Sequence, residues 1–162
     1  MTDLVLRPIR EADLDAVRRL QADSFSALAG DIHSPAQIAA HVALIMAPDY
    51  AADLLSNNLL VAEAPDGALV ATAGWCRVPD DAAVARLRKV FVAPGRAGQG
   101  LGRRMVEASE QAARDAGFHR FRVRANANAE AFYARLGYRP VRREDMLTAG
   151  GIALPTVIMV KG

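Results

Sequence analysis

A turn rich in glycine is the part of the sequence best suited to bind a ligand. Residues 90–117, VFVAPGRAGQGLGRRMVEASEQAARDAG, begin as an apolar strand, continue through Gly98, Gly100 and Gly102, and end as a helix. The first N–H groups of a helix have no partners within the helix and lie at the positive end of its dipole. Glycine lets an anion approach the main chain and supplies positive φ angles that point successive N–H groups inward. The turn therefore predicts a site for an anion such as a pyrophosphate.

The spacing of these glycines separates the turn from the common nucleotide-binding motifs. A P-loop ends in Gly-Lys-Ser/Thr and the dinucleotide fingerprint is G-x-G-x-x-G, whereas this turn is G-x-G-x-G. Arg96, Arg103 and Arg104 add positive charge nearby. A tight strand–helix connection, in which the glycines only relieve crowding, remains the alternative.

The charge is divided unevenly along the chain. Residues 86–143 hold 14 Lys and Arg against 4 Asp and Glu, a balance of +10, and the remaining residues hold 6 against 14, a balance of −8. A basic segment favours an anionic partner, which leaves nucleic acid, a phosphate-bearing cofactor and an acidic substrate open. Of the 162 residues, 52% are hydrophobic and 23% charged, as in globular proteins. We expect one domain over residues 1–162 with a core that needs neither a metal nor a disulfide.

The first residues and the cysteine content favour the cytoplasm. The start, MTDLVLRPIREADL, includes acids and arginines and lacks the apolar core of a secretory signal. No apolar run approaches the roughly 18 residues of a membrane span, and the single cysteine, Cys76, has no partner within the chain. We therefore expect a cytoplasmic protein with no membrane partner.

Hydrophobic periodicity and turn residues predict an α+β fold. Ser34 is the expected N-cap of one helix, with Pro35 at its first position, and Pro65–Gly67 is the expected turn of a hairpin. The order predicts a mixed, mostly antiparallel central sheet of about seven strands, with helices on both faces and one strand–helix–strand crossover. The expected strands lie at residues 4–10, 58–64, 68–79, 80–94, 118–126, 138–146 and 152–161, and the expected helices at residues 10–25, 34–48, 49–57, 101–117 and 127–137.

The helix of the crossover is expected to bury one stripe of side chains and to end at Gly117. In a sheet with such a crossover, a ligand is expected beyond the carboxyl end of the strand that enters it. That end is the glycine turn. The expected buried stripe consists of Leu101, Met105, Ala108, Ala112 and Ala116.

The glycine turn resembles a signature of the GNAT superfamily of N-acetyltransferases. In that family a strand ending in V-x-P leads into Arg/Gln-x-x-Gly-x-Gly/Ala, and main-chain amides of the turn hold the pyrophosphate of the cosubstrate. The resemblance implies that Ala97, which stands where the family usually has Arg or Gln, contributes its N–H group only. The matching residues are Val92, Pro94, Ala97, Gly100 and Gly102.

A second segment, NANAEAFYARLGYRP, is similar to the other signature of this family, Asn-x-x-Ala-x-x-x-Tyr followed by Leu-Gly-aromatic. Together with the order of the predicted elements, the two signatures extend the resemblance over nearly the whole chain. The resemblance implies a GNAT-like fold, acetyl-CoA as cosubstrate and no metal. The matching residues are Asn126, Ala129, Tyr133, Leu136, Gly137 and Tyr138.

The resemblance also implies which residues bind the cosubstrate. The strand with Phe91 and Val92 corresponds to the family segment whose main-chain groups pair with the pantetheine amides, and whose bulge polarises the thioester carbonyl. Asn126 corresponds to a contact with the pantetheine arm or its neighbourhood. The implied cofactor-binding residues are Phe91, Val92, Ala97, Gly98, Gln99, Gly100, Leu101, Gly102, Arg103 and Asn126.

Tyr133 is the implied catalytic residue, acting as a general acid. Its helical spacing places it on a stripe with Ala129, Phe132 and Leu136, so that the ring faces inward while the hydroxyl can reach the edge of a cavity. When an amine attacks a thioester, the thiolate leaves more readily if a donor protonates it. A core tyrosine whose hydroxyl meets a carbonyl is the alternative. Asn128 is expected to cap the helix that carries Tyr133.

The sequence offers no clear general base. Many relatives carry a Glu on the strand before the glycine turn, but this strand, AVARLRKVFV, has none. Hairpin acids are usually solvated and lone histidines are usually structural, so the remaining candidates carry little weight. A water chain, or an amine that arrives neutral, is the alternative. The candidates are Glu63, Asp80, Asp81, His33 and His41.

Arginines alternate on two strands that are expected to be parallel neighbours. Arg86 and Arg88 share one face of the first strand, and Arg120, Arg122 and Arg124 share one face of the next. If both rows lie on the same face, they form a basic floor that could bind a carboxylate or phosphate of the acceptor or of a partner chain. A solvated face whose arginines pair with acids is the alternative. The acids expected for such pairs are Asp80, Asp81, Glu144 and Asp145.

The predicted function is transfer of an acetyl group from acetyl-CoA to a primary amine of a small molecule or peptide, by direct attack on the thioester. Residues 23–48 correspond to the variable helical cap over the acceptor cleft of the family and are expected to set acceptor specificity. A catalytically silent acyl-CoA sensor is one alternative. A nucleic-acid binder is the other, but the basic strands lack exposed interleaved aromatics and no helix is a recognition-helix candidate, so no nucleic-acid partner is expected. A homodimer through exposed sheet ends remains open.

Overall fold

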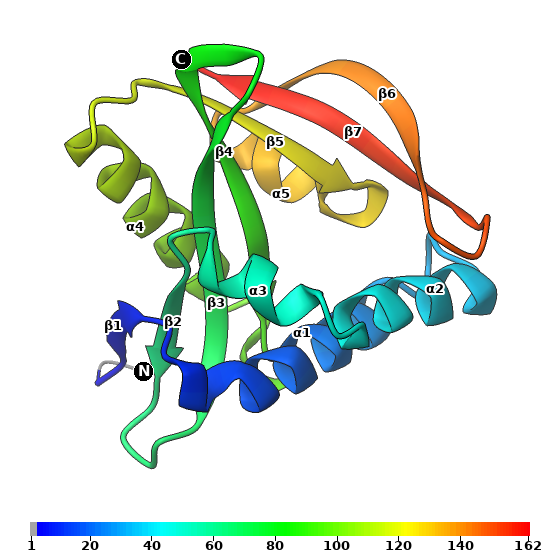
Figure 1. Ribbon diagram of the computed structural model, residues 1–162, viewed down its shortest axis with the longest axis horizontal. Coiled ribbons are helices and arrows are strands. Elements are labelled where there is room, and N and C mark those ends of the chain that lie inside the picture. Colours follow the sequence, from blue (N-terminus) through cyan, green and yellow to red (C-terminus); the bar gives the residue numbers. More distant parts are fainter. Residues whose placement is uncertain (1–2) are drawn as a thin grey trace.

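The computed structural model describes residues 3–162 and contains one seven-stranded sheet in the order β1-β2-β3-β4-β5-β7-β6 (Figure 1). The mixed, mostly antiparallel α+β fold expected from the sequence is confirmed. The strands are β1 (Val5–Pro8), β2 (Leu60–Glu63), β3 (Leu69–Val78), β4 (Asp81–Val92), β5 (Arg120–Asn126), β6 (Arg139–Leu147) and β7 (Ala153–Lys161). The α-helices are α1 (Leu14–Leu28), α2 (Pro35–Met46), α3 (Tyr50–Leu55), α4 (Leu101–Asp115) and α5 (Glu130–Arg135). Short 3-10 turns lie at Glu11–Asp13, Pro94–Arg96 and Ala127–Ala129.

Strands β4 and β5 form the only parallel pair of the described sheet, and their ladder is short. It pairs residues 84–87 with residues 120–123, and α4 is the crossover between the two strands. Beyond Leu87 and Val123 the strands separate, and Figure 1 shows β5 turning away from β4. The sheet therefore opens at the carboxyl end of β4, where the sequence predicts the ligand.

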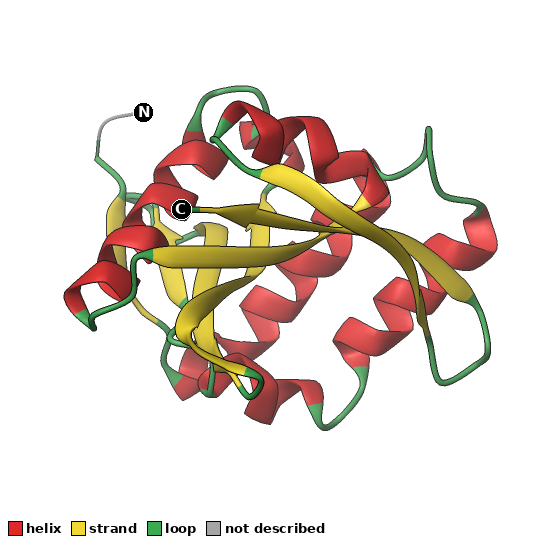
Figure 2. Cartoon of the chain, turned by 90° about the horizontal axis from the view of Figure 1, so that it is seen from above, coloured by secondary structure: helices red, strands yellow, loops and turns green. Residues whose placement is uncertain are grey.

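Helices cover both faces of the sheet, as Figure 2 also shows. Because successive side chains of a strand point to opposite faces, adjacent residues of β2 contact different helical layers. Val61 packs with residues of α1, α2 and α3, whereas Ala62 packs with Leu101 and Met105 of α4. Tyr133 of α5 belongs to the same core cluster as residues of α4, so these two helices share a face. No helix in residues 3–162 combines the length and apolar composition needed to cross a membrane.

Helix α4 confirms the predicted crossover but buries a different stripe. Leu101 and Met105 are buried as expected, whereas Ala108 and Ala112 are only half-buried and Ala116 is exposed. The buried face differs from the predicted one because the helix also buries the carboxylate of a glutamate, which has partners inside the protein. The spacing of apolar residues cannot indicate such a buried carboxylate. The buried residues of α4 are Leu101, Met105, Val106, Ser109, Glu110 and Ala113.

Helices α1 and α2 are tied to each other and to the far half of the sheet. Ser34 caps α2 as predicted, since its hydroxyl accepts the N–H of Gln37 at 3.2 Å and its own N–H donates to the Gln37 side chain at 2.9 Å. The Gln37 amide also donates to the carbonyl of Ala153 in β7 at 3.0 Å. Arg18 of α1 donates to the carbonyl of Ile45 in α2 at 3.1 Å. These contacts hold the helical layer over the opening between β4 and β5.

Strand β4 has an irregularity next to this opening. Thr72 pairs with Phe91 and Gly74 pairs with Arg88, so the longer interval on β4 lies opposite a shorter one on β3. This is a β-bulge, which bends a strand and leaves a residue out of the ladder. Within it Lys89 has a φ of 60°, a left-handed conformation that few residues other than glycine adopt. The bulge re-aims the backbone of β4 as it enters the opening.

Candidate active site

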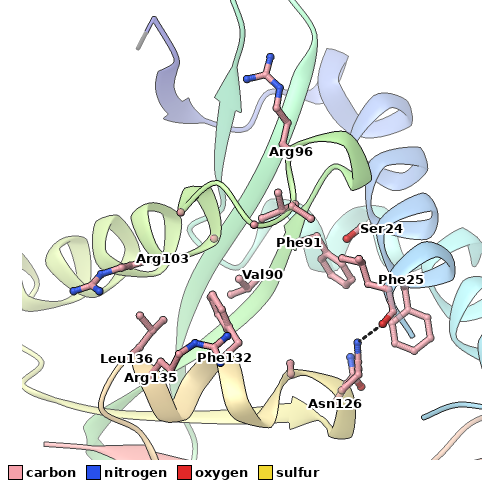
Figure 3. Close-up of a pocket in the computed structure, with 18 residues that line it drawn as sticks. Ser24, Phe25, Val90, Phe91, Arg96, Arg103, Asn126, Phe132, Arg135 and Leu136 are labelled. Carbon is pink, nitrogen blue, oxygen red and sulfur yellow. Dashed lines mark hydrogen bonds between the residues drawn. The ribbon is translucent and has the colours of Figure 1, made fainter. Parts of the chain in front are cut away.

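A large cavity lies where the glycine turn, the end of β4 and helices α1 and α5 meet (Figure 3). Its volume is about 590 Å³. Segments far apart in the sequence contribute to it, and the glycine turn supplies one wall. The lining residues are Ser24, Phe25, Leu28, Val90, Phe91, Val92, Arg96, Ala97, Gly98, Gly100, Gly102, Arg103, Asn126, Asn128, Ala129, Phe132, Arg135 and Leu136.

The glycine turn presents free main-chain donors at the start of α4. Gly98 and Gly100 have φ angles of 77° and 79°, and Gly100 is the N-cap residue. The first bonded N–H at this end is that of Arg104, which donates to the Gly100 carbonyl at 3.1 Å. The N–H groups of residues 98–103 make no hydrogen bond to the rest of the described chain. A row of such donors at the positive end of a 15-residue helix is suited to an anion.

The structure separates the two explanations of the glycines. A Cβ atom built at Gly98 or Gly100 would have no heavy atom within 4 Å, so crowding does not explain these glycines, and their positive φ angles do. A Cβ at Gly102 would lie 3.1 Å from the ring of Phe132, so this glycine does relieve crowding. The pattern therefore combines backbone conformation at the first two positions with close helix packing at the third.

Two arginines of this region line the cavity at its rim. Figure 3 shows the guanidinium groups of Arg96 and Arg103 pointing away from the middle of the cavity. Arg103 donates from Nε to Glu107 at 2.8 Å on an exposed face of α4. Arg104 is exposed and does not line the cavity. The main chain, and not arginine side chains, dominates this end of the site.

Some expected cofactor-binding residues lie at its margin. Gln99 is exposed and Leu101 is buried in the core beside Met105, and neither lines the cavity. Ala97 does line it, but its N–H donates to the Pro94 carbonyl at 3.3 Å, so this amide is partly engaged. The remaining expected cofactor-binding residues all line the cavity.

Tyr133 lies in a second cavity of about 160 Å³ that adjoins the first. The two cavities meet at the end of β4 and the start of α5, because they share the same four lining residues. Tyr133 itself is buried, yet no hydrogen bond joins its hydroxyl to another residue of the described chain. The hydroxyl oxygen is not among the fully buried unpaired atoms of the described residues, so it is accessible from the cavity. The residues common to both cavities are Val90, Phe91, Asn126 and Ala129.

The neighbouring Tyr138 shows what a structural tyrosine looks like in this core. Its hydroxyl donates to the carboxylate of Glu110 at 2.7 Å, and Lys161 pairs with the same carboxylate at 3.0 Å. The rings of Tyr133 and Tyr138 lie 5.6 Å apart, edge to face. The two tyrosines are in contact, and of the two only Tyr138 has a hydrogen-bond partner for its hydroxyl among the described residues. The alternative of a satisfied core tyrosine fits Tyr138 and not Tyr133.

Burial sets the protonation state of the Tyr133 phenol. Removal from water raises the pKa of Tyr133 above its ordinary value of 10.0, because the charged phenolate would lose its solvation. The group is therefore protonated at neutral pH and can donate a hydrogen bond or a proton. A donor of this kind, facing a cavity, has the properties required of a general acid.

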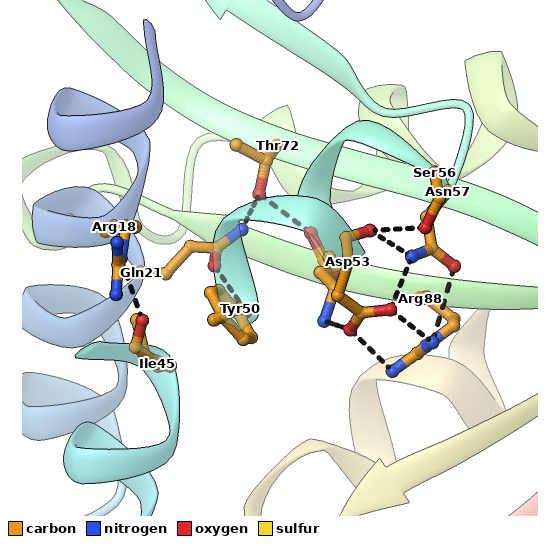
Figure 4. Close-up of polar contacts among 10 residues, drawn as sticks. Arg18, Gln21, Ile45, Tyr50, Asp53, Ser56, Asn57, Thr72 and Arg88 are labelled. Atoms are coloured by element: carbon orange, nitrogen blue, oxygen red, sulfur yellow. Dashed lines mark hydrogen bonds and ion pairs between the residues drawn. The ribbon is translucent and has the colours of Figure 1, made fainter. Parts of the chain in front are cut away.

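A buried chain of hydrogen bonds supports the bulge of β4 (Figure 4). The Tyr50 hydroxyl donates to Gln21 at 2.6 Å, the Gln21 amide donates to Thr72 at 3.1 Å, and the Thr72 hydroxyl donates to the Lys89 carbonyl at 2.7 Å. Every member is satisfied, so the chain fixes the backbone at the point where the two cavities meet. No pattern in the sequence indicates this chain, because its members come from four different elements.

The candidates for a general base are engaged elsewhere or lack basicity. Glu63 pairs with Arg7 at 3.0 Å, and Asp80 pairs with Arg122 at 3.4 Å. Asp81 accepts the N–H of Ala83 at 3.0 Å in its own turn. These acids do not line either cavity.

The two histidine candidates are both buried. His41 lines the second cavity, where it stacks on Phe25 with ring centroids 3.9 Å apart. Burial, aided by the charges of His33 and Lys89, lowers the pKa of His41 to about 4. His33 is also buried, and burial lowers its pKa as well. Both imidazoles are neutral at physiological pH and are weak bases.

The two rows of arginines lie on the same face of the sheet. Arg86 lies opposite Arg122 in the parallel ladder, and Arg86, Arg88 and Arg124 all line the second cavity. The expected pairing with acids also occurs in part. Arg122 pairs with Asp80, and Arg124 pairs with Glu144 at 2.7 Å.

Two asparagines of the second signature have different positions. Asn126, at the end of β5, lines both cavities. The expectation that Asn128 caps the following helix is wrong: the N-cap of α5 is Ala129, and Asn128 lies within a 3-10 turn. Its amide instead donates to the carbonyl of Leu28 at 3.4 Å, which joins this turn to the end of α1. The extra 3-10 turn displaces the helix start by one residue.

Sequence reasoning missed the contribution of α1 to the first cavity. Ser24, Phe25 and Leu28 of this helix line it. Their part of the chain was assigned to the acceptor side, because residues 23–48 are variable cap residues in the family that the sequence resembles. Only the packing of α1 across the opening reveals that this helix lines the first cavity.

Comparisons with known proteins agree with this geometry. A family model described as an acetyltransferase (GNAT) domain matches residues 56–140, which contain the glycine turn and Tyr133. A GCN5-related N-acetyltransferase of Rhodopseudomonas palustris, also described as a class-II aminotransferase, is 25% identical, with a TM-score of 0.88 over 100% of this chain and 97% of that chain.

Two further solved structures contain ligands. The PaiA N-acetyltransferase of Thermoplasma acidophilum, in complex with coenzyme A, is 17% identical with a TM-score of 0.78 over 99% of each chain. YncA of Salmonella typhimurium, with acetyl-CoA, is 20% identical with a TM-score of 0.64 over 98% of this chain and 93% of that chain. At this level of identity both similarities support the fold.

Proposed function

Because the chain belongs to the GNAT acetyltransferase family, we propose that it transfers the acetyl group of acetyl-CoA to a primary amine of a small molecule or peptide. One observation carries the proposal. A cavity with free main-chain donors at one end meets, at its other end, a second cavity that contains the unpartnered hydroxyl of Tyr133. The two ends fit the two ends of an acyl-CoA thioester, a diphosphate and a sulfur.

The residues of the first cavity fit the cosubstrate. The N–H groups from Gly98 to Arg103 would hold the diphosphate, since they are unpaired and lie at a helix N-terminus. Phe91 and Val92 of β4, with Asn126 of β5, line the path from there to the second cavity. Acetyl-CoA supplies the activated acyl group, and the protein binds and orients it.

Tyr133 would act on the leaving group. The amine nitrogen attacks the thioester carbonyl carbon, the C–S bond breaks, and the sulfur leaves with the electron pair of that bond. The Tyr133 phenol gives its proton to this sulfur, and the proton of the amine passes to water. The phenol then regains a proton from solvent. Its raised pKa keeps it in the donating form over the whole range in which amines become neutral.

Two measurements in sequence test the proposal. Acetyl-CoA should raise the melting temperature, because a ligand at 100 times its Kd stabilises the native state by about 2.7 kcal/mol. Release of free thiol from acetyl-CoA should then accelerate in the presence of at least one member of a panel of primary amines and peptides. Binding of acetyl-CoA without amine-dependent thiol release would favour the silent sensor, and absence of binding would reject the assignment of the first cavity.

A further inference from the structure

Arg86 has an unpaired guanidinium group that lines the second cavity. It lies in β4, half-buried, on the sheet face covered by α1, α2 and α3. No hydrogen bond or salt bridge joins its side chain to another residue in the range 3–162. Removing a positive charge from water without a partner is costly, so such a group is a candidate for binding an anion.

The other cations around Arg86 already have acidic partners. Arg88 pairs with Asp53 at 3.3 Å, and Lys89 pairs with the same carboxylate at 2.6 Å. Figure 4 shows Arg88 held between Asp53 and Asn57. Asp53 therefore has no capacity left for Arg86.

The partner strand is neutralised in the same way. Arg122 pairs with Asp80 at 3.4 Å, and Arg124 pairs with Glu144 at 2.7 Å. Around the cavity, six positive side chains face three carboxylates, because Glu144 also pairs with Arg142 at 2.9 Å. This leaves a formal excess of three positive charges. The positive side chains are Arg86, Arg88, Lys89, Arg122, Arg124 and Arg142, and the carboxylates are Asp53, Asp80 and Glu144.

The surroundings of Arg86 make an added anion favourable. Burial and then the charge of Arg88 lower the pKa of Arg86, with smaller contributions from Arg124 and Arg122. The guanidinium remains charged at neutral pH because its ordinary pKa is far above 7. An anion that pairs with Arg86 would relieve both the lost solvation and the repulsion from its neighbours.

We propose that Arg86 binds a carboxylate of the acceptor, so that the substrate is a small amine that carries a carboxylate. This inference rests on the proposed function and concerns the acceptor side of the same site. Val90, where the two cavities meet, lies four positions after Arg86 in β4. The separation of the two residues is at most about 13 Å, the length of an extended strand, and is shorter here because of the bulge at Lys89. The carboxylate therefore stands several bonds from the reacting amine, as in an ω-amino carboxylate and unlike glycine.

The test compares 5-aminopentanoate with its uncharged amide, 5-aminopentanamide, as acceptors for the same enzyme. The wild type should favour the carboxylate by roughly 10- to 100-fold in kcat/KM, the range of a charge-assisted hydrogen bond. Arg86→Gln should abolish this preference by raising the KM for 5-aminopentanoate, while the amine of 5-aminopentanamide is still acetylated. Equal kcat/KM for both acceptors in the wild type, or an unchanged preference in Arg86→Gln, would overturn the proposal.

Arg122→Gln is the matched control, because Arg122 is the register partner of Arg86, carries the same charge and does not line the cavity. It should retain the preference for the carboxylate, whereas an equal loss in both variants would show a general charge effect and reject a specific role for Arg86. Arg86→Lys keeps the charge without the guanidinium fork and should retain an intermediate preference. This variant also covers the case in which Arg86→Gln does not fold.

A binding measurement separates this inference from the proposed function. If no amine accelerates thiol release, the proposed function fails, and calorimetry of 5-aminopentanoate with the coenzyme A-saturated protein decides on Arg86 alone. Binding that is lost in Arg86→Gln and kept in Arg122→Gln supports the anion site. Absence of binding to the wild type overturns it.

Discussion

The two cavities differ in what their walls offer a ligand. The first presents main-chain N–H groups of a glycine turn, and its nearest arginines point outward. The second presents charged and aromatic side chains from α2, α3, α5, β4 and β5. Main-chain N–H groups can hold a diphosphate whatever the side chains of the turn are. A cavity lined by side chains changes its ligand preference with each substitution. The comparison teaches that the proposed cosubstrate end depends on backbone conformation and the proposed acceptor end on residue identity.

Tyr133→Phe should have the largest effect, because it removes the proposed proton donor from the second cavity. Loss of the proton donor should lower kcat by about 10²- to 10⁴-fold, while the Kd for acetyl-CoA stays within a factor of about two, because the hydroxyl does not line the first cavity. Steady-state kinetics and calorimetry measure the two quantities. Unchanged kcat would remove the acid role.

Tyr138→Phe is the control for that experiment, since the two rings are in contact and differ in their partners. It leaves the buried carboxylate of Glu110 with one donor fewer, which should cost about 1–3 kcal/mol of unfolding free energy. Turnover of the folded fraction should be retained. A loss of kcat equal to that of Tyr133→Phe would mean that both act through packing.

Gly100→Ala should disturb the main-chain N–H groups that line the first cavity. Alanine at a φ of 79° costs about 1–2 kcal/mol, and relief of this strain would reorient the N–H groups at the start of α4. We expect about a tenfold increase in the Kd for acetyl-CoA, from loss of one main-chain hydrogen bond to a charged group. Gly117→Ala provides the matched control at the other end of α4, with a φ of 100° and open space around it. Equal Kd changes in the two variants would contradict a specific role for the turn.

The pH dependence of stability should reveal the neutral histidine of the second cavity. His41 has a pKa of about 4 in the folded protein and about 6.5 when unfolded, so the unfolded state binds more protons in that window. The free energy of unfolding should therefore fall by about 2 kcal/mol from pH 7 to pH 5. In His41→Phe, which keeps a ring against Phe25, the decrease should shrink to the part contributed by His33. Denaturant titrations at the two pH values measure it, and an identical slope in both proteins would reject the assignment.

Arg103→Gln should have a small effect on the Kd for acetyl-CoA. It tests whether side chains contribute to binding at the first cavity. The group is exposed and already paired with Glu107, so its attraction for a diphosphate is worth about 0.2–1 kcal/mol, which is less than about fivefold in Kd at low salt. Arg104→Gln, exposed and outside the cavity, should change the Kd even less. A larger loss than in Gly100→Ala would show that side chains dominate this end as well.

The sequence was informative where local patterns determine the structure. The order of the strands and helices, the cap at Ser34, the crossover and the glycine turn follow from periodicity and turn chemistry, and all appear in the structure. The second cavity depends on contacts between distant segments. Nothing in the spacing of Gln21, Tyr50 and Thr72 indicates that they join one hydrogen-bond chain.

Rotation of α4 and the position of Asn128 were beyond sequence patterns for a similar reason. Glu110, and not the stripe of alanines, determines which face of α4 is buried. Its burial depends on donors from β7 and from the loop before β6. Asn128 is the type of residue that caps helices, but a 3-10 turn precedes the helix and its amide bonds to α1 instead. In both cases a tertiary contact decided between alternatives that were locally equivalent.

The short ladder between β4 and β5 has a consequence for solubility. Unpaired strand edges ordinarily attract strands of other molecules and promote aggregation, so proteins cover, charge or shorten them. Here the edges that separate beyond Leu87 and Val123 face each other inside the fold, under α1 and α2 and beside α5. The protein can thus keep unpaired backbone available to an extended ligand at strand edges that helices cover.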